Sequence, residues 1–348
     1  MKKRLRRNFL RSKKPEHLII FVHGLSNKPP KELLRQWYID SVWEGLKMAE
    51  YEVKAFDLEV VYWADLMYPK PLDPKIKDKK HPLYIDEPYV PFDGKYQRTT
   101  HNKRNTILDK VERWLESLFL KKQPWINLDY VFDIVTRRIV KDLYIYYRQK
   151  IKGENDVEEV AREVIRRRLV RKLKRNKHKK IMLISHSMGS IIAYDVLTHV
   201  LPHIEVDLFV TIGSPLGLPM IKREIFKELN LEFDANDRLP TPENITGGWY
   251  NLSDHRDAIS ADSSLSDDYQ PNSKGIGPQD IEIINTYQMD GVANVHKSFG
   301  YLRAPQMIGI IYKFITEKEE GFLESIFNKC KTLIGEAVDA VEQIGLKQ

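Results

Sequence analysis

A serine lies between two apolar stretches of the sequence, where a strand could turn into a helix. Residues 181–184 (Ile-Met-Leu-Ile) are typical of a short buried strand, and residues 191–194 resume an apolar pattern at helical spacing. The residues two positions before and after Ser187 are small, Ser185 and Gly189. Only small side chains fit where strand and helix pass so closely, so the pattern predicts a nucleophile elbow with Ser187 at its corner. The alternative is a buried strand that leads into an ordinary helix.

A histidine and a group of aspartates could complete the chemistry of this serine. A serine hydroxyl is a weak nucleophile near neutral pH, so it needs a base, and the base needs an acid that orients it. His296 is the only histidine after His255 and follows the last predicted strand. The acidic loop after the preceding strand contains Asp254 and Asp257, with Asp262 further on. We expect His296 to be the base and one of these aspartates to orient it.

Strands and helices alternate along most of the chain. The apolar pattern predicts six strands, over residues 17–22, 52–63, 181–184, 206–212, 248–252 and 281–289. Helical spacing predicts helices at about 31–50, 156–176, 219–230 and 298–316. This alternation predicts an α/β fold with a mainly parallel sheet and helices on both faces. Sites in such sheets lie at the carboxyl ends of the strands, which is where Ser187 and His296 fall.

Three short motifs resemble one known superfamily. Residues 185–189 (Ser-His-Ser-Met-Gly) resemble the G-x-S-x-G elbow of the α/β-hydrolases, especially lipase-like members that read G-H-S-M-G. Ser185 replaces the usual first glycine, and we interpret it as a small-residue variant. Residues 23–25 (His-Gly-Leu) resemble the H-G-x element of the same superfamily. Residues 213–215 (Gly-Ser-Pro) resemble a segment that lines the floor of the site in lipase-like relatives.

The resemblance implies roles for individual residues. In α/β-hydrolases the chain order is serine, acid, histidine, which implies Ser187 as nucleophile and His296 as base. Asp257 is followed by a small and an apolar residue, as in lipase-like hydrolases, so Asp257 is the preferred acid and Asp254 the alternative. The resemblance covers roughly residues 17–63 and 156–316.

The same resemblance implies an oxyanion hole. Two preorganised backbone N–H groups are needed to stabilise the negative charge of a tetrahedral intermediate. The residue after the nucleophile, Met188, would supply one of them. Leu25, in the loop after the first strand, would supply the other, with Gly24 allowing a tight approach. The side chain of His23 is expected to be structural.

The pattern changes between residues 64 and 150. Residues 69–91 contain six prolines among aromatic and charged residues, too many for regular structure. Helical patterns follow at about 103–121 and 126–149. By analogy with other α/β-hydrolases, this insertion into a domain spanning residues 17–316 is predicted to form a helical cap. The alternative is a structural insertion without a role in the site.

Composition and cysteine content predict the cellular setting. Of the 348 residues, 42% are hydrophobic and 30% are charged, as in soluble globular proteins. No apolar stretch reaches the roughly 18 residues that a membrane span needs. The apolar run at 18–22 is too short for a signal peptide. The single cysteine, Cys330, cannot form an intrachain disulfide, so we expect a cytoplasmic protein.

The net charge of +7 is concentrated in two segments. Residues 1–14 carry eight Lys or Arg and no acid, within a predicted flexible arm at 1–16. Residues 162–180 carry eleven basic residues and one acid. These segments could contact an anionic membrane, whereas nucleic acid fits less well because Phe9 is their only Phe, Tyr or Trp that could stack on a base. The alternative is a solvated helix face and a disordered tail.

The C-terminal segment, residues 317–348, is predicted to be an amphipathic helix. Apolar residues recur at alternating spacings of three and four between Leu323 and Ile344. Such a stripe could dock onto the chain's own domain, or it could form a homodimer.

These observations favour a serine ester hydrolase, lipase- or esterase-like, that forms an acyl-enzyme on a small-molecule or lipid ester. The alternatives are a catalytically silent scaffold that binds a partner or anionic lipid, and an acyltransferase. We expect no cofactor and no metal. The Asp-rich loop at 253–268 could hold calcium, but its spacing matches no ligand template.

Overall fold

The computed structural model describes residues 17–94, 142–153, 157–201, 203–232, 238–257 and 264–317. The predicted arm at 1–16 and the predicted helix at 103–121 lie outside these residues. So do Asp262 and all but the first residue of the predicted C-terminal helix. The predictions for these parts remain predictions.

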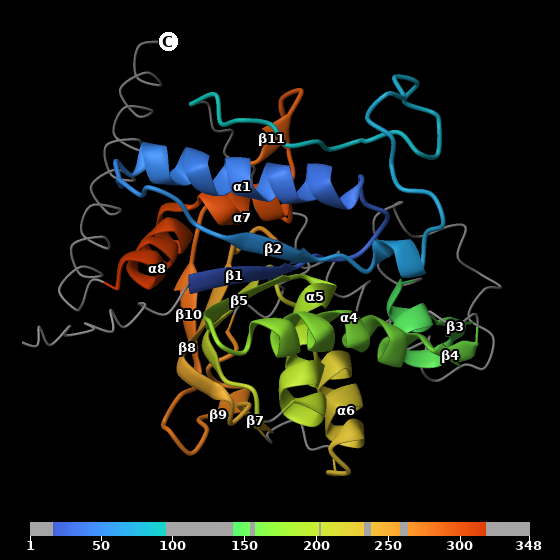
Figure 1. Ribbon diagram of the computed structural model, residues 1–348, viewed down its shortest axis with the longest axis vertical. Helices are drawn as coiled ribbons and strands as arrows, with labels where there is room; N and C mark the ends of the chain where they lie inside the picture. The colour runs from blue at the N-terminus through green and yellow to red at the C-terminus, as the bar shows by residue number, and fades with distance from the viewer. Residues whose placement is uncertain are drawn as a thin grey trace, which may run out of the picture.

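A parallel sheet of six strands forms the centre of the fold, as the sequence predicted (Figure 1). Its strands, in spatial order, are β10 (Pro278–Glu282), β8 (Ile245–Ser253), β6 (Val206–Ile212), β5 (Lys180–His186), β1 (His17–Val22) and β2 (Leu58–Val61). Every neighbouring pair is parallel. Strands buried on both faces are almost entirely apolar, which explains the continuous hydrophobic runs at 18–22 and 181–184.

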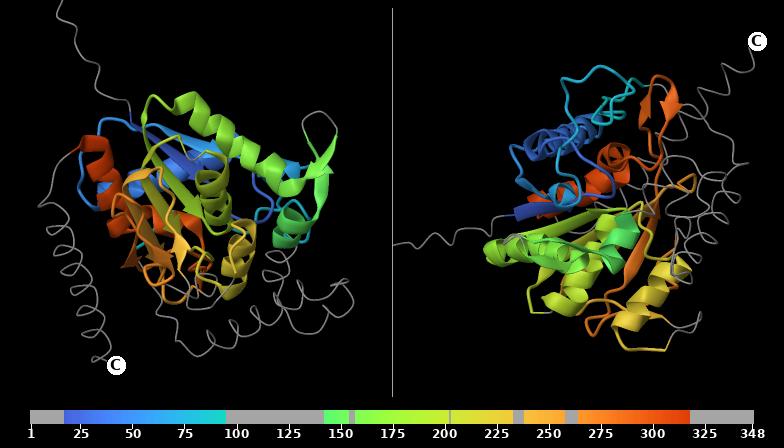
Figure 2. Two further views of the ribbon diagram at one scale, coloured as in Figure 1. Left: turned by 90° about the horizontal axis from the view of Figure 1, so that it is seen from below. Right: turned by 90° about the vertical axis from the view of Figure 1, so that its right-hand side faces the viewer.

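Helices cover both faces of the sheet (Figures 1 and 2). One face carries α1 (Lys31–Met48), α7 (Ser298–Arg303) and α8 (Pro305–Thr316). The other carries α4 (Ala161–Asn176), α5 (Met188–Asp195) and α6 (Pro219–Glu228). Alternate residues of β1 point to opposite faces, Ile20 into the second core and Phe21 into the first. The sheet is therefore the wall between two hydrophobic cores.

The predicted strand at 281–289 is wrong in its extent. Strand β10 ends at Glu282, and the chain leaves the sheet because the backbone N–H of Asn285 donates to the Asp254 carboxylate at 2.7 Å. The Asp254 carboxylate thus replaces the backbone carbonyl of a neighbouring strand as the acceptor. The chain then forms a hairpin of β11 (Gln288–Met289) and β12 (Val292–Ala293). Its turn residues, Asp290 and Gly291, both have positive φ, as a two-residue hairpin turn requires.

Two predicted helices differ from the observed ones at their boundaries. The helix predicted at 298–316 is broken into α7 and α8, because Ala304 precedes Pro305 and takes an extended conformation (φ −60°, ψ 137°). The helix predicted to start at 156 begins at Ala161. The residues before it form β4 (Glu158–Val160), which pairs in antiparallel fashion with β3 (Lys150–Lys152).

The described parts of the 64–150 insertion have little regular structure. Residues 69–91 contain only turns and bends, as their prolines predict, after the short 3₁₀ helix η1 (Ala64–Leu66). Residues 142–148 are helical, within the helix predicted at 126–149. Elsewhere, helix α5 continues into a π-helical turn, η2 (Val196–Val200), and β7 (Leu239–Pro240) pairs with β9 (Tyr269–Gln270). No helix within the described ranges is long and apolar enough to cross a membrane.

Candidate active site

Ser187 occupies a strained corner between β5 and α5. Its φ of 54° and ψ of −129° lie outside the regions that side-chain-bearing residues normally adopt. Two backbone hydrogen bonds hold the corner: the Ser187 N–H donates to the carbonyl of Ile212 at 3.1 Å, and the Ser190 N–H donates to the carbonyl of Ser187 at 2.8 Å. Such strain costs about 1–3 kcal/mol and is found mainly at functional sites.

Small residues are required around this corner. A Cβ added at Gly189 would lie 2.5 Å from the carbonyl oxygen of Val22, so no larger residue fits there. A Cβ added at Gly24 would lie 2.9 Å from the Cβ of Ser187. Ser185, at the position of the usual first glycine, is fully buried, and its hydroxyl donates to a carbonyl of β6 at 3.4 Å. A serine is therefore accommodated at this position.

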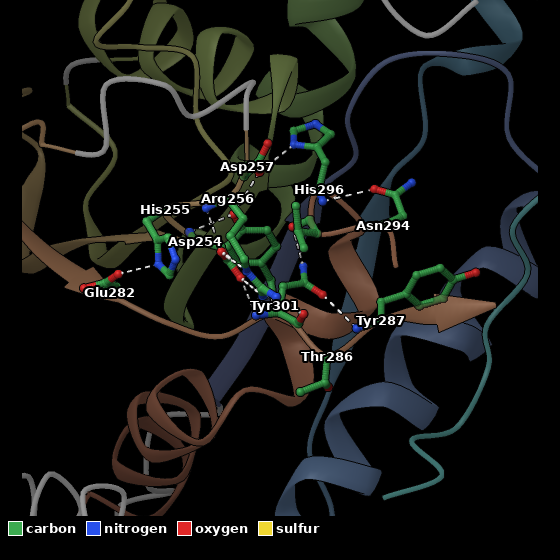
Figure 3. A network of polar contacts seen from close by, with 12 residues as sticks. Asp254, His255, Arg256, Asp257, Glu282, Thr286, Tyr287, Asn294, His296 and Tyr301 are labelled. Atoms are coloured by element: carbon green, nitrogen blue, oxygen red, sulfur yellow. Dashed lines mark hydrogen bonds and ion pairs between the residues drawn. The ribbon is translucent and has the colours of Figure 1, made fainter. Parts of the chain in front are cut away.

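His296 contacts Asp257 at the carboxyl edge of the sheet (Figure 3). The imidazole Nδ1 lies 2.8 Å from Asp257 Oδ2. A carboxylate only accepts hydrogen bonds, so Nδ1 carries the proton and Nε2 of the neutral ring is left as a base. The Tyr301 hydroxyl donates to the same Asp257 oxygen at 2.9 Å. The Asp257 side chain is 2% exposed and that of His296 is 22% exposed, so the carboxylate is buried while solvent reaches the imidazole.

Asp254, the alternative acid, has a different set of partners. Its carboxylate accepts hydrogen bonds from the Arg256 guanidinium and from the backbone N–H of Asn285 (Figure 3). Burial raises the pKa of Asp254 to about 6. Asp254 therefore links two loops, and Asp257 is the carboxylate that the fold brings to His296.

Ser187 is connected to the Asp257–His296 pair through the end of β6. Its N–H is bonded to Ile212, and the next residue, Gly213, lies against both other side chains. A Cβ added at Gly213 would lie 3.0 Å from Asp257 Oδ2 and 3.2 Å from His296 Nδ1. The Ser187 hydroxyl is buried and has no hydrogen-bond partner among the described residues, so the serine is not bonded to the histidine. Such bonds are often long in empty sites and tighten when substrate binds.

His186 is a neighbour of the site that sequence reasoning missed. Its Nε2 donates to the carbonyl of His296 at 2.8 Å, and the two rings are 4.8 Å apart. Burial holds the pKa of His186 well below its usual value, so the ring is neutral. His186 thus ties the Ser187 corner to the loop that carries His296. The only sequence signal was its place within the Ser-His-Ser-Met-Gly motif.

The two residues predicted to form the oxyanion hole flank the serine. Met188 is the first residue of α5, so its N–H has no acceptor within the helix. Leu25 follows Gly24, whose backbone packs directly on Ser187. The next residue, Ser26, has a φ of 71°, which turns the loop sharply. These positions are compatible with two N–H groups near the hydroxyl.

His23 is buried in the wall of this loop. The Trp63 backbone N–H donates to its Nε2 at 3.1 Å, and the indole N–H of Trp63 donates to the His23 carbonyl at 3.0 Å. The two rings stack with centroids 4.7 Å apart. Burial lowers the pKa of His23 well below its usual value. These contacts support the structural role expected for His23.

A family comparison agrees with this architecture. The family model of the PGAP1-like alpha/beta domain matches residues 128–288, which include β5, the Ser187 corner and Asp257. The matched region carries four of the six parallel strands, and β1 and β2 extend the same sheet. The matched domain and the parallel sheet support an assignment to the α/β-hydrolase superfamily.

The solved structures that are similar to this chain are distant from it. An uncharacterized protein from Bacillus cereus ATCC 10987 is 13% identical with a TM-score of 0.32, over 91% of this chain. The chain spans 65% of the length of that protein. Est1E from Butyrivibrio proteoclasticus is 11% identical with a TM-score of 0.30, over 88% of this chain and 91% of its own. A comparison with curated proteins found no significant sequence match.

One cluster in the described part of the chain has the composition of a metal site. Ligand atoms of Asp195, His199 and Glu228 lie within 4.8 Å of one another. Arg166 occupies the position of a cation, because its Nη2 is 2.6 Å from Asp195 and 2.8 Å from Glu228. An arginine already balances these acids, so the cluster does not fit a metal.

The basic helix α4 is more involved in internal ion pairs than the sequence suggested. Basic side chains of residues 162–180 contact acids on β2, β4, α6 and neighbouring loops; the pairs include Arg162–Glu228, Arg167–Glu159, Arg168–Asp65, Lys172–Glu59 and Lys179–Asp57. Much of the charge is therefore used within the fold. Contact with an anionic membrane stays a prediction.

Proposed function

We propose that this chain is a serine hydrolase that cleaves carboxylic esters through an acyl-enzyme. The observation that carries the proposal is the Asp257–His296 contact beside the strained Ser187 corner. The two contacting side chains follow different strands, and the serine follows a third. A buried carboxylate, a solvent-reachable imidazole and a strained serine are the parts that nucleophilic acyl transfer requires.

The proposed reaction has two halves. Ser187 Oγ attacks the ester carbonyl carbon while His296 Nε2 accepts the hydroxyl proton. The carbonyl oxygen becomes an oxyanion, which the N–H groups of Leu25 and Met188 stabilise. The C–O bond to the leaving alcohol then breaks, and His296 returns the proton to that alcohol. Water repeats the sequence on the acyl-enzyme and releases the carboxylic acid and free Ser187.

Asp257 has two tasks in this scheme. It holds the proton on Nδ1 of His296, so Nε2 faces the serine as a base. Its charge then stabilises the imidazolium that forms in each half-reaction. The Tyr301 hydroxyl donates to the same carboxylate oxygen and fixes its direction.

A fluorophosphonate probe tests this proposal, because it reacts only with an activated serine. Ser187→Ala should abolish labelling and the hydrolysis of p-nitrophenyl esters. Ser190→Ala is the matched control, since this nearby hydroxyl donates to the Ser185 carbonyl and has no proposed part in the chemistry. Full labelling of Ser187→Ala, or none of the unaltered protein, would reject the proposal; the second result would favour a catalytically silent scaffold.

An acyltransferase would use the same acyl-enzyme. Adding increasing concentrations of an alcohol to the ester assay separates the two activities. A hydrolase should release mainly the free acid, whereas an acyltransferase should form mainly the new ester.

A further inference from the structure

Two carboxylates from the insertion contact the loops on either side of Ser187. Glu87 lies near the end of residues 64–94, the first described part of the insertion. Asp142 is the first residue of the second described part, residues 142–150. We infer that Glu87 and Asp142 are positioning residues, which hold the His296 loop and the Leu25 loop in their working geometry. This inference rests on the proposed function and assigns the insertion a part in it beyond covering the site.

Glu87 holds the residues around His296. Its Oε1 accepts a hydrogen bond from Asn294 Nδ2 at 2.6 Å, and its Oε2 accepts one from Lys297 Nζ at 3.0 Å. Asn294 Oδ1 in turn accepts the backbone N–H of His296 at 3.0 Å (Figure 3). The amide of Asn294 can adopt only this orientation, because one partner is an acceptor and the other a donor. A continuous chain of bonds therefore runs from Glu87 to His296.

The charge and the backbone around Glu87 suit this role. Burial alone would raise the pKa of Glu87, but Lys297 and the Asn294 amide together lower it below its usual value, so the carboxylate stays ionised. The segment that follows is fixed at both ends. The Tyr287 hydroxyl donates to the carbonyl of Pro88 at 2.7 Å, and Arg303 donates to the carbonyl of Val90 at 2.8 Å.

Asp142 holds the loop on the other side. It is fully buried, and its Oδ2 accepts the backbone N–H of Ser26 at 2.7 Å. Its Oδ1 accepts the hydroxyl of Tyr68 at 2.7 Å. Ser26 has the positive φ that turns the chain directly after Leu25. Asp142 thus stabilises the conformation that aims the Leu25 N–H, and both contacts bridge segments distant in sequence.

Four variants of the full chain test this inference. Glu87→Ala removes both bonds, Glu87→Gln keeps an acceptor for Asn294, and Asp142→Asn keeps one acceptor oxygen. Asp78→Asn is the matched control, because this carboxylate of the same segment is exposed and, among the described residues, accepts a hydrogen bond only from the nearby Lys80 N–H. The readouts are kcat and KM for p-nitrophenyl acetate per titrated active site, and amide hydrogen exchange of residues 23–28 and 293–300.

Misplacing a reacting group by about 1 Å can cost on the order of 100-fold in rate. Glu87→Ala should lower kcat about 10- to 100-fold, with KM changed less than about twofold, and should raise amide exchange at residues 293–300. The kcat of Glu87→Gln should lie between those of Glu87→Ala and the unaltered protein. Asp142→Asn should lower kcat about tenfold and raise exchange at 23–28. Unchanged kcat together with unchanged exchange would overturn the inference. A rise in KM with kcat unchanged would also overturn it. The exchange test decides even if the unaltered protein is inactive, a result that would reject only the proposed function.

Discussion

Two buried charge clusters, one beside helices α4, α5 and α6 and one at the carboxyl edge of the sheet, both contain an aspartate and a tyrosine but differ in the partner of the aspartate. Near α4, α5 and α6, Asp195 accepts from the Tyr146 hydroxyl and is paired with Arg166. At the carboxyl edge, Asp257 accepts from the Tyr301 hydroxyl and is paired with His296. Both contain a buried aspartate, a tyrosine and a cation or potential cation.

The difference is whether the partner of the aspartate can exchange a proton. Arg166 is always ionised, its side chain is 6% exposed, and it is bonded to Asp195 and Glu228. An imidazole, unlike a guanidinium, can both accept and release a proton, and the side chain of His296 is more exposed. A buried carboxylate alone therefore does not mark a reactive site. The first cluster can only hold the structure together, whereas the second can move protons.

Asp257→Asn should have the largest effect on turnover. The amide can donate to Nδ1 and would stabilise the wrong tautomer, so kcat should fall about 10³- to 10⁴-fold with little loss of stability. Steady-state kinetics with a p-nitrophenyl ester and thermal unfolding measure the two effects. A decrease of less than tenfold would show that Asp257 does not orient the base.

Arg166→Met should have the opposite profile. Removing Arg166 leaves the Asp195 carboxylate buried without its cation, while Glu228 keeps its pair with Arg162, so the free energy of unfolding should fall by about 3–5 kcal/mol. Urea denaturation measures this loss, and kcat per folded molecule should stay within about twofold. Arg167→Met on the same helix is the control, since the side chains of its pair with Glu159 are 37% and 35% exposed and the pair should contribute less than about 1 kcal/mol. Loss of kcat in folded Arg166→Met would contradict the comparison.

The stability of the fold should decrease at acid pH because of two buried histidines, His23 and His186. Burial holds the pKa values of His23 and His186 well below the usual value. Below about pH 6.5 the unfolded chain binds protons at these histidines that the folded chain does not, so stability should decrease as the pH falls. Each histidine contributes up to about 1.4 kcal/mol per pH unit. Urea unfolding at pH 7.5, 6.5 and 5.5 should show a shallower dependence for His186→Gln; an unchanged slope would argue against a neutral His186.

The two tyrosines provide the finest test. Tyr301→Phe should lower kcat by up to about tenfold, because Asp257 loses a hydrogen bond that directs it toward His296. Tyr146→Phe removes the matching hydroxyl from Asp195 and should cost about 1 kcal/mol of stability with kcat unchanged. Parallel kinetics and urea unfolding of both variants distinguish these outcomes. Equal effects of both variants on kcat would remove the distinction between the clusters.

Local rules explain why the corner and the sheet could be predicted from sequence. Ser187 needs small neighbours because Gly189 faces the Val22 carbonyl, and this requirement is visible as a motif. The central strands β1, β5 and β6 are largely apolar because both faces of the sheet are covered there. The choice of Asp257 over Asp254 came from the resemblance, and it agrees with the observed contact to His296.

Pairing between distant residues could not be predicted in this way. A sequence shows that α4 is basic, but not that Arg166 is buried against Asp195 and Glu228. Similarly, nothing in the chain near Glu87 indicates a bond to Asn294. The predicted last strand was too long because a side chain, Asp254, ended the ladder. These interactions depend on the tertiary fold, to which periodicity and composition are insensitive.

The sheet order also determines when the native state can form during synthesis. Strand β1 lies between β2 and β5, with His17 paired to Lys180, so one of its edges has no partner until the insertion and β5 have emerged from the ribosome. Such long-range parallel pairing is slow, and it leaves an apolar strand edge exposed to other chains. We therefore expect the nascent N-terminal half to need protection from association with other chains. His296 is made later still, so its contact with Asp257 can form only after most of the chain has been translated.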